Sequence, residues 1–305
     1  MSIDLSRRSF LVRTPAAALA LAAGVRRIAA DPLGGVPPGI QLYTVGADIQ
    51  KDPAGTLHAL RQIGYVYVEA AGFGKLSPAD FRKAIDDAGL KCPSAHLQFS
   101  SADPGPLFDQ AHTLGVEYVV SSILTTRPFG KSIMEAIRAL SSQTADDFKR
   151  NAALANSIAG KAKAAGLQYA YHNHNFEFRD LGGGKTGYDI VLAETDPELV
   201  KFELDCGWMC AAGKNPVHYF RRYPTRYRMI HVKDFVKGPA TTVLMGPGSP
   251  KGTELGRGFI DYRPIFKAAR VAGVQYYFSE QEPPFTDMSA LAAAKADYAY
   301  MHAIS

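Results

Sequence analysis

Short apolar runs alternate with amphipathic stretches along most of the chain, and the same signals recur where they meet. Five of the apolar runs start directly after a glycine that closes a helical pattern, at Gly64, Gly89, Gly115, Gly166 and Gly273. Glycine takes a left-handed backbone at a helix terminus without steric cost, so a strand can follow at once. Asp52-Pro53 and Ser77-Pro78 place a capping side chain before a proline, which is typical of a helix start. The pattern predicts a repeated helix–strand unit.

The apolar runs predict eight strands, over residues 40–45, 65–70, 91–98, 117–123, 168–178, 200–208, 227–235 and 276–282. Helical patterns lie between them, over residues 53–63, 78–88, 107–114, 145–165, 188–194 and 261–272. Strands that alternate with helices run parallel, and eight such units close into a barrel. An open doubly wound sheet is the alternative, but no glycine-rich dinucleotide turn follows the first strand. We therefore expect a single (β/α)8 TIM barrel over residues 31–305.

Two of the predicted connections are long, residues 125–144 after the fourth strand and residues 236–259 after the seventh. Loops of this length in a compact domain are usually functional or disordered. The second connection is rich in Gly, Pro and Thr and could form a lid over a site.

The composition is that of an ordinary globular protein, with 47% hydrophobic and 21% charged residues in a chain of 305. The net charge of +5 is concentrated in residues 1–30, where five arginines face a single aspartate. The rest of the chain holds 29 basic and 28 acidic side chains. This balance leaves no general basic field for nucleic acid, so we expect no nucleic-acid partner.

Residues 1–30 have the pattern of an export signal. Arg7-Arg8 is followed by Phe10-Leu11, by an alanine-rich run over 16–23 and by small residues at 28–30. The arrangement resembles a bacterial twin-arginine signal peptide, which implies a periplasmic protein exported in its folded state. The apolar run is far shorter than the ~20 residues of a membrane-spanning helix, so we expect no stable membrane insertion after signal removal. An amphipathic basic helix is the alternative interpretation.

Polar side chains recur where nearly every predicted strand ends. They are Gln41, Tyr43, Glu69, His96, His172, His174, Glu177, Glu203, Asp205, His231, Lys233, Asp234, Glu280 and Glu282. In a TIM barrel the C-terminal ends of the strands form the active site. Such groups are costly to bury unless they are paired or bind a metal. One inward ligand from each of the last four strands would hold a divalent ion, with a buried ion-pair network as the alternative.

Four segments, residues 171–178, 203–208, 230–235 and 278–282, resemble successive signatures of the sugar isomerase/epimerase family. This is the xylose isomerase-like barrel group, which also includes inosose dehydratases and an AP endonuclease branch. The segments 40–45 and 256–261 fit the same family, so the resemblance covers nearly all of residues 39–285.

The resemblance implies one divalent ion on strands five to eight, held here by His172, Asp205, His231 and Glu280. The mixed ligand set favours Mn²⁺, Co²⁺, Fe²⁺ or Zn²⁺ over Mg²⁺. Ketose epimerases of the family have an acid/base glutamate where His172 stands, which argues against a symmetric two-glutamate epimerisation. Either His174 or Glu177 would take over the proton transfer, or His174 would be the ligand in place of His172.

The implied chemistry is removal of a proton next to a carbonyl, through an enediolate stabilised by the metal. The candidate catalytic residues are His174, Glu177, Glu280 and, as the partner of the oxyanion, Lys233. The candidate substrate-binding residues are Gln41, Glu69, His96, Trp208 and Arg257. Alternative roles are a salt bridge from Lys233 to Asp234 or Glu203, core packing for Trp208, and structural hydrogen bonds for His96 and Glu69.

Three functions compete for this carbohydrate-binding site. The first is a sugar isomerase or epimerase. The second is a lyase or dehydratase that eliminates a β-substituent from a 3-keto-glycoside or an inosose-like substrate. The third is a non-catalytic sugar-binding protein, which would not need four metal ligands. DNA-repair endonuclease activity is rejected, because it requires a larger metal cluster and a basic face. A homo-oligomer is compatible with all three functions.

Overall fold

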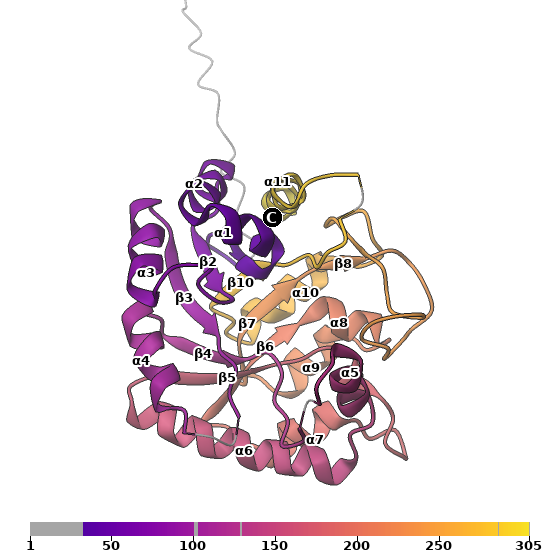
Figure 1. Ribbon diagram of the computed structural model, residues 1–305. Coiled ribbons are helices and arrows are strands. Elements are labelled where there is room, and N and C mark those ends of the chain that lie inside the picture. Colours follow the sequence, from indigo (N-terminus) through magenta and orange to yellow (C-terminus); the bar gives the residue numbers. More distant parts are fainter. Residues whose placement is uncertain (1–32, 101–102, 129, 286, 305) are drawn as a thin grey trace, which may run out of the picture.

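The computed structural model describes residues 33–304, except residues 101–102, 129 and 286. Eight parallel strands form a closed barrel in the order β1-β10-β7-β6-β5-β4-β3-β2, which confirms the predicted (β/α)8 fold (Figure 1). The strands are β1 (Gly39–Gln41), β2 (Tyr67–Ala70), β3 (Lys91–His96), β4 (Tyr118–Ser121), β5 (Gln168–His172), β6 (Val200–Asp205), β7 (Tyr227–Val232) and β10 (Tyr276–Ser279). The predicted signal peptide, residues 1–30, lies outside the described residues.

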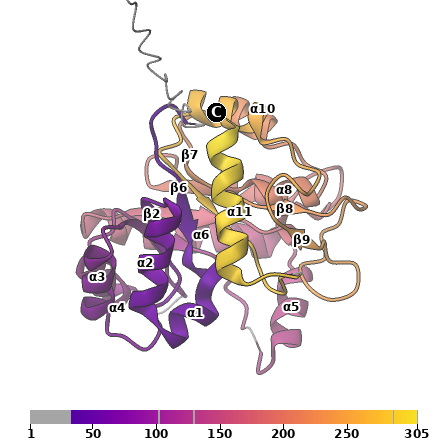
Figure 2. The same cartoon turned by 90° about the horizontal axis from the view of Figure 1, so that it is seen from above.

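The helices surround the barrel. They are α1 (Gly46–Lys51), α2 (Pro53–Ile63), α3 (Pro78–Asp87), α4 (Gly105–Leu114), α5 (Ile133–Ser141), α6 (Ala145–Ala164), α7 (Gly187–Glu194), α8 (Cys206–Ala211), α9 (Pro216–Arg222), α10 (Tyr262–Val271) and α11 (Ala290–Ala303). Figure 2 shows α11 beside α2, so the last helix closes the ring against the first part of the chain. In the described part of the chain, no helix has both the length and the apolar character needed to cross a membrane.

Two helix starts form as the sequence predicts. The side chains of Asp52 and Ser77 accept backbone N–H bonds at the first turns of α2 and α3. Gly115 has a φ of 68° where α4 ends, so the chain turns into β4 through the left-handed region.

Several strands end earlier than predicted, and at one of them a polar side chain starts a helix. The strand predicted over 168–178 stops at His172, and residues Phe176–Phe178 form the 3-10 helix η2. The strand predicted over 200–208 stops at Asp205, whose side chain caps α8. The strand predicted over 227–235 breaks after Val232, and β8 (Asp234–Phe235) pairs antiparallel with β9 (Gly252–Thr253). The predicted loop 125–144 contains α5.

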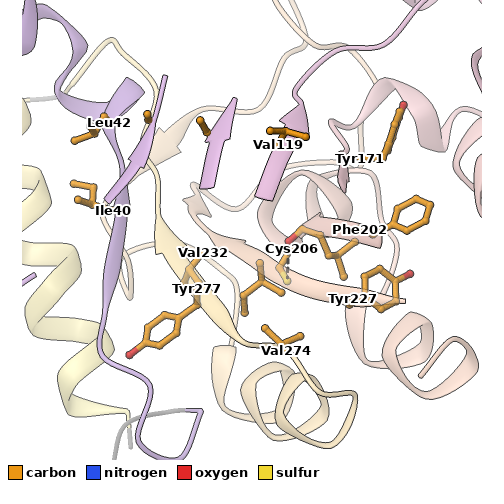
Figure 3. Close-up of a cluster of buried hydrophobic side chains, with 14 of the residues drawn as sticks. Ile40, Leu42, Val119, Tyr171, Phe202, Cys206, Tyr227, Val232, Val274 and Tyr277 are labelled. Atoms are coloured by element: carbon orange, nitrogen blue, oxygen red, sulfur yellow. Dashed lines mark hydrogen bonds between the residues drawn. The ribbon is translucent and has the colours of Figure 1, made fainter. Parts of the chain in front are cut away.

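The main core lies between the strands and the helices, where Ile40, Val119, Phe202 and Tyr227 are packed (Figure 3). A separate apolar cluster is formed by Tyr118, Val120, Ala170, Met229 and Phe278. Side chains two residues apart on a strand share a face, so the last three of these lead directly to His172, His231 and Glu280. The polar side chains of the rim therefore rest on an apolar layer.

Candidate active site at the mouth of the barrel

His172 ends β5 with both ring nitrogens next to carboxylates. Its Nδ1 atom lies 3.1 Å from Glu203 Oε2, and its Nε2 atom lies 3.9 Å from Asp205 Oδ2. Glu203 and Asp205 are two residues apart on β6, so their side chains share a face and bracket the ring. His172 is only 2% exposed, and burial lowers its pKa well below the ordinary value. The imidazole is therefore neutral and can offer a lone pair.

His231 on β7 is bracketed in the same way. Its Nε2 atom lies 2.7 Å from Glu69 Oε2, and its Nδ1 atom lies 2.8 Å from Glu280 Oε2 and 3.9 Å from Asp205 Oδ2. Burial alone would lower the pKa of His231, but the carboxylates of Glu203 and Glu280 raise it well above the ordinary value. His172 thus lies between the deeper Glu203 and Asp205, which is nearer the mouth. His231 likewise lies between the deeper Glu69 and Glu280, which is nearer the mouth.

Four residues converge as the sequence predicted, each with a ligand-type atom within 4.8 Å of the others: His172, Asp205, His231 and Glu280. The Oδ2 atom of Asp205 is buried and accepts no hydrogen bond from any described residue, although Lys233 Nζ lies 3.2 Å away. A buried carboxylate oxygen that accepts no hydrogen bond is costly. Two imidazoles and two carboxylates are a common donor set for divalent transition metals. The residues present therefore fit a divalent cation.

A second group of four lies on the other side of the two rings, formed by His96, Glu203 and the remaining nitrogens of His172 and His231. The Nε2 atom of His96 lies 2.7 Å from Glu203 Oε2 and 3.2 Å from Glu69 Oε2. Burial opposes the protonation of His96, but these two carboxylates raise its pKa to about 10. Carboxylates placed behind ligating imidazoles typically accept the second ring N–H and orient the ring. The sequence had grouped Glu203 with Asp205 and had considered it only as a salt-bridge partner of Lys233.

Glu69, which was expected to bind sugar hydroxyls, is fully buried. Its oxygens accept hydrogen bonds from Gln41 Nε2 at 2.8 Å and from Ser94 Oγ at 2.5 Å. Gln41 also accepts the backbone N–H of Tyr43 through Oε1 at 3.0 Å, which fixes the amide. The structure therefore gives Glu69 contacts within the protein, whereas Gln41 and His96 line the cavity at the mouth.

Lys233 contacts three carboxylates other than the two considered from the sequence. Its Nζ atom lies 3.2 Å from Asp205, 2.9 Å from Glu280 and 2.8 Å from Glu282, and 4.9 Å from the ring centroid of Trp208. The indole N–H of Trp208 donates to Glu282 at 3.2 Å, and the side chain is only 3% exposed. Trp208 thus packs into the wall of the site and holds Glu282 in place.

Asp234, one of the expected partners of Lys233, binds backbone groups instead. Its carboxylate accepts N–H bonds from Gly256 at 3.1 Å, Gly258 at 3.0 Å and Ile260 at 3.2 Å. A Cβ atom on Gly258 would lie 2.0 Å from the carboxylate, so the close approach requires glycine. Asp234 therefore shapes the 256–260 turn.

His174 and Glu177, the two alternative proton-transfer residues, have different environments. The Nδ1 atom of His174 is buried without a hydrogen-bond partner among the described residues, and burial followed by Lys233 lowers the pKa of the ring to about 3. Glu177 accepts the backbone N–H of His174 at 2.9 Å and the hydroxyl of Tyr171 at 3.1 Å. Burial raises the pKa of Glu177 to about 8. His174 lines the cavity, whereas Glu177 supports it from behind.

Two asparagines in the same segment had not been singled out from the sequence. Asn173 Oδ1 accepts the backbone N–H of Asp205 at 3.1 Å. Asn175 Nδ2 donates to the carbonyl oxygens of Thr241 at 3.2 Å and Val243 at 2.9 Å, which anchors the 236–259 connection to the rim. The strand period carried no signal for these contacts, because β5 ends at His172 and both asparagines follow it.

Two cavities meet at the polar cluster. The larger is about 560 Å³ and its polar lining consists of Gln41, Tyr43, His96, Gln98, Gln110, Ser122, His172, His174, Glu280 and Glu282. The smaller is about 390 Å³ and includes Trp208 and Lys233. Leu244, Met245, Glu280 and Glu282 line both. Arg257, a candidate substrate-binding residue, lines neither cavity. Its side chain is exposed, and its Nη1 atom lies 3.4 Å from Glu254 Oε2.

A family model described as xylose isomerase-like TIM barrel matches residues 57–298 of the chain. An inosose dehydratase from Lacticaseibacillus casei is 29% identical over 153 residues, which are 46% of this chain and 49% of that protein. The chain thus matches about half the length of the curated relatives that it resembles.

Among solved structures, a sugar phosphate isomerase/epimerase from Parabacteroides distasonis is 25% identical, with a TM-score of 0.70. The match covers 87% of this chain and 97% of that one. A xylose isomerase-like TIM barrel protein from Mycobacterium smegmatis, solved in complex with magnesium, has a TM-score of 0.61 over 88% of this chain and 96% of its own. At 17% identity the latter shows a shared fold alone.

Proposed function

Because this chain belongs to the xylose isomerase-like TIM barrel family, we propose that it is a divalent-metal-dependent enzyme that removes a proton next to the carbonyl of a sugar or keto-sugar. The observation that carries the proposal is the buried Oδ2 atom of Asp205, which lies 3.9 Å from a nitrogen of His172 and 3.9 Å from a nitrogen of His231. A cation between these atoms would compensate the carboxylate. The names of the relatives, isomerase/epimerase and inosose dehydratase, support a sugar-like substrate.

In this proposal His172, Asp205, His231 and Glu280 hold one ion, with Mn²⁺, Co²⁺, Fe²⁺ and Zn²⁺ as the candidates. When bound, such an ion supplies Lewis-acid stabilisation for the negative charge that develops on the substrate oxygens. Glu203 accepts the Nδ1–H of His172, which leaves Nε2 as the free nitrogen on the side of Asp205. This contact favours His172 over His174 as the ligand on β5.

His174 is the proposed base. It lines the larger cavity, and no described residue forms a hydrogen bond with its buried Nδ1 atom, so this nitrogen is available to accept a proton. Glu177 fixes the backbone of His174 and thus acts as a positioning residue. Lys233 stabilises negative charge on the substrate, and Glu280, which lines both cavities, is the second candidate for proton transfer.

The first candidate reaction is isomerisation or epimerisation, in which the proton returns to the substrate. The second is β-elimination, in which a substituent leaves from the neighbouring carbon. One observation favours elimination: β5 ends in His172, so the metal group has a single carboxylate lining the cavity, Glu280, rather than two acid/base carboxylates. Elimination also agrees with the dehydratase name of the curated relative.

Proton NMR in D₂O tests the proposal. The Mn²⁺-loaded protein is incubated with ketoses, inososes and 3-keto-glucosides, and a chelator-treated sample serves as the control. Deuterium at one carbon of an intact skeleton indicates isomerisation, whereas a new alkene or a released aglycone indicates elimination. Sugar binding without exchange or elimination on any substrate would contradict the proposal and leave a non-catalytic sugar-binding protein.

A further inference from the structure

The larger cavity has two chemically different sides. The lining formed by β2, β3, β4 and their following segments is mainly apolar away from His96: Ala71, Phe73, Leu97, Leu107 and Ile123. The 236–259 connection adds Leu244 and Met245, which also line the smaller cavity beside Lys233. The other polar groups of the β2–β4 lining, Gln98, Gln110 and Ser122, are uncharged. The histidines and carboxylates gather at the ends of β3, β5 and β10. A ligand that filled this cavity would contact ionisable groups at one end and apolar groups at the other.

The volume of the larger cavity also indicates that its ligand has a polar part and an apolar part. The cavity of about 560 Å³ lies within the range of roughly 300–1,000 Å³ of pockets that enclose drug-sized ligands. A single sugar ring placed against His172 and Glu280 would leave the space beside Phe73 and Leu107 to water. Water against an apolar wall is unfavourable, so this space fits an apolar part of the ligand.

Two large apolar side chains at the rim are exposed next to the cavity. Tyr43 is 54% exposed and Met245 is 51% exposed, and both line it. A tyrosine ring and a flexible methionine are suited to contact a flat apolar group. No lysine or arginine occurs among the described residues that line this cavity, so away from His96 and the proposed metal group a phosphate would find no cationic side chain there.

We infer that the substrate is an uncharged oxidised sugar conjugate, a keto-glycoside with an aryl or comparable apolar group, and that this group contacts the apolar lining formed by Phe73, Leu107, Ile123 and Met245. The inference rests on the proposed function, because it takes the sugar ring to lie at the cluster of His172 and Glu280. It names the substrate class within that function: a keto-glycoside rather than a free sugar or a sugar phosphate.

Calorimetric titration of the Mn²⁺-loaded full chain tests the inference with three probes. Phenyl β-D-glucopyranoside and methyl β-D-glucopyranoside lack the keto group and serve as unreactive analogues, and D-glucose 6-phosphate is the third probe. The phenyl glycoside is expected to bind about tenfold more tightly than the methyl glycoside, since a few buried carbons in an apolar pocket have an effect of this size. Equal binding of the two glycosides, tighter binding of the phosphate, or no binding of the phenyl glycoside would overturn it.

A pair of methionine variants tests where in the cavity the preference for the phenyl glycoside arises. Met245→Ala removes a side chain at the cavity and is expected to reduce the preference for the phenyl glycoside at least threefold, without affecting the methyl glycoside. Met134→Ala is the matched control, because Met134 is 64% exposed on α5 and does not line the cavity. A preference that neither Met245→Ala nor Phe73→Ala reduces would overturn the assignment of this side. Failure of the proposed function is seen separately, as absence of metal-dependent exchange in D₂O, and would leave a measured phenyl preference intact.

Discussion

Glu203 Oε2 lies 3.1 Å from Nδ1 of His172, on the side of the ring opposite to Asp205. The contact determines which nitrogen of the imidazole remains available, since a ring that donates one N–H to a carboxylate presents its other nitrogen as a lone pair. His96 and His231 contact the same carboxylate oxygen, at 2.7 Å and 3.2 Å. Glu203 therefore organises the metal group without belonging to the four proposed ligands.

Replacing Glu203 by glutamine tests this role. The amide keeps the shape but loses the charge that orients His172 and His231, so Mn²⁺ affinity is expected to fall about 10–100-fold. Metal titration of the folded variant measures the change, and circular dichroism confirms that the barrel is intact. Glu194→Gln, at an exposed position on α7, is the control and is expected to bind Mn²⁺ as the unmodified chain does. Unchanged affinity in Glu203→Gln would contradict the role given to Glu203.

Alanine substitutions at His172 and His174 separate the ligand from the base. His172→Ala is expected to lose stoichiometric metal binding, because it removes one of four ligands. His174→Ala is expected to keep the metal and to lower the rate of deuterium exchange by about 10²–10⁴-fold, the usual contribution of a general base. Elemental analysis and NMR exchange rates measured on the same samples provide both values. Loss of the metal from His174→Ala alone would reverse the two assignments.

Asp297 on α11 predicts a pH dependence of stability that is independent of the metal group. It is buried, accepts the backbone N–H of Leu255 at 2.8 Å, and its pKa is raised to about 7, chiefly by burial. The folded chain therefore holds this proton more tightly than the unfolded chain, whose aspartates titrate near ~3.9. The free energy of unfolding should accordingly fall as the pH rises through this interval and stay lower above pH 7.

Asp297→Asn keeps an acceptor for Leu255 and removes the titration. The variant is expected to gain stability relative to the unmodified chain at pH 8 compared with pH 5, as measured by urea unfolding at both pH values. Glu254 is the acidic neighbour that raises this pKa most, so Glu254→Gln should reduce the pH dependence in part. The same stability difference between Asp297→Asn and the unmodified chain at both pH values would show that Asp297 is ionised in the folded protein.

Residues 1–30 are proposed to direct export through the twin-arginine route to the periplasm. Replacing Arg7 and Arg8 by lysine keeps the charge but removes the paired guanidinium groups, so the protein is expected to accumulate in the cytoplasm. Cell fractionation followed by immunoblotting measures the distribution, with Arg26→Lys/Arg27→Lys as the matched control. Normal export of the Arg7/Arg8 variant would contradict the proposal.

The local sequence determined the barrel and the rim of this protein. Glycines that end helices, prolines that start them and apolar runs of strand length set eight repeated units, because each signal acts over a few residues. The two-residue period of a strand then placed His172, Asp205, His231 and Glu280 above Ala170, Glu203, Met229 and Phe278. Convergence of four ligand-type residues at one mouth follows from that period and from closure of the sheet.

Only the tertiary structure decided what each rim residue contacts. Glu69 and Glu203 lie behind the histidines, and Glu177 lies behind His174, although the sequence presents all three alike as acidic residues near strand ends. Arg257, a substrate-binding candidate in the 236–259 connection, lies outside both cavities. The reason is that a side chain with several rotatable bonds takes its direction from partners far away in the chain, such as Glu69, which is 162 residues from His231. The apolar side of the cavity arises likewise, from segments 73, 107, 123 and 245 that meet only when the barrel has closed.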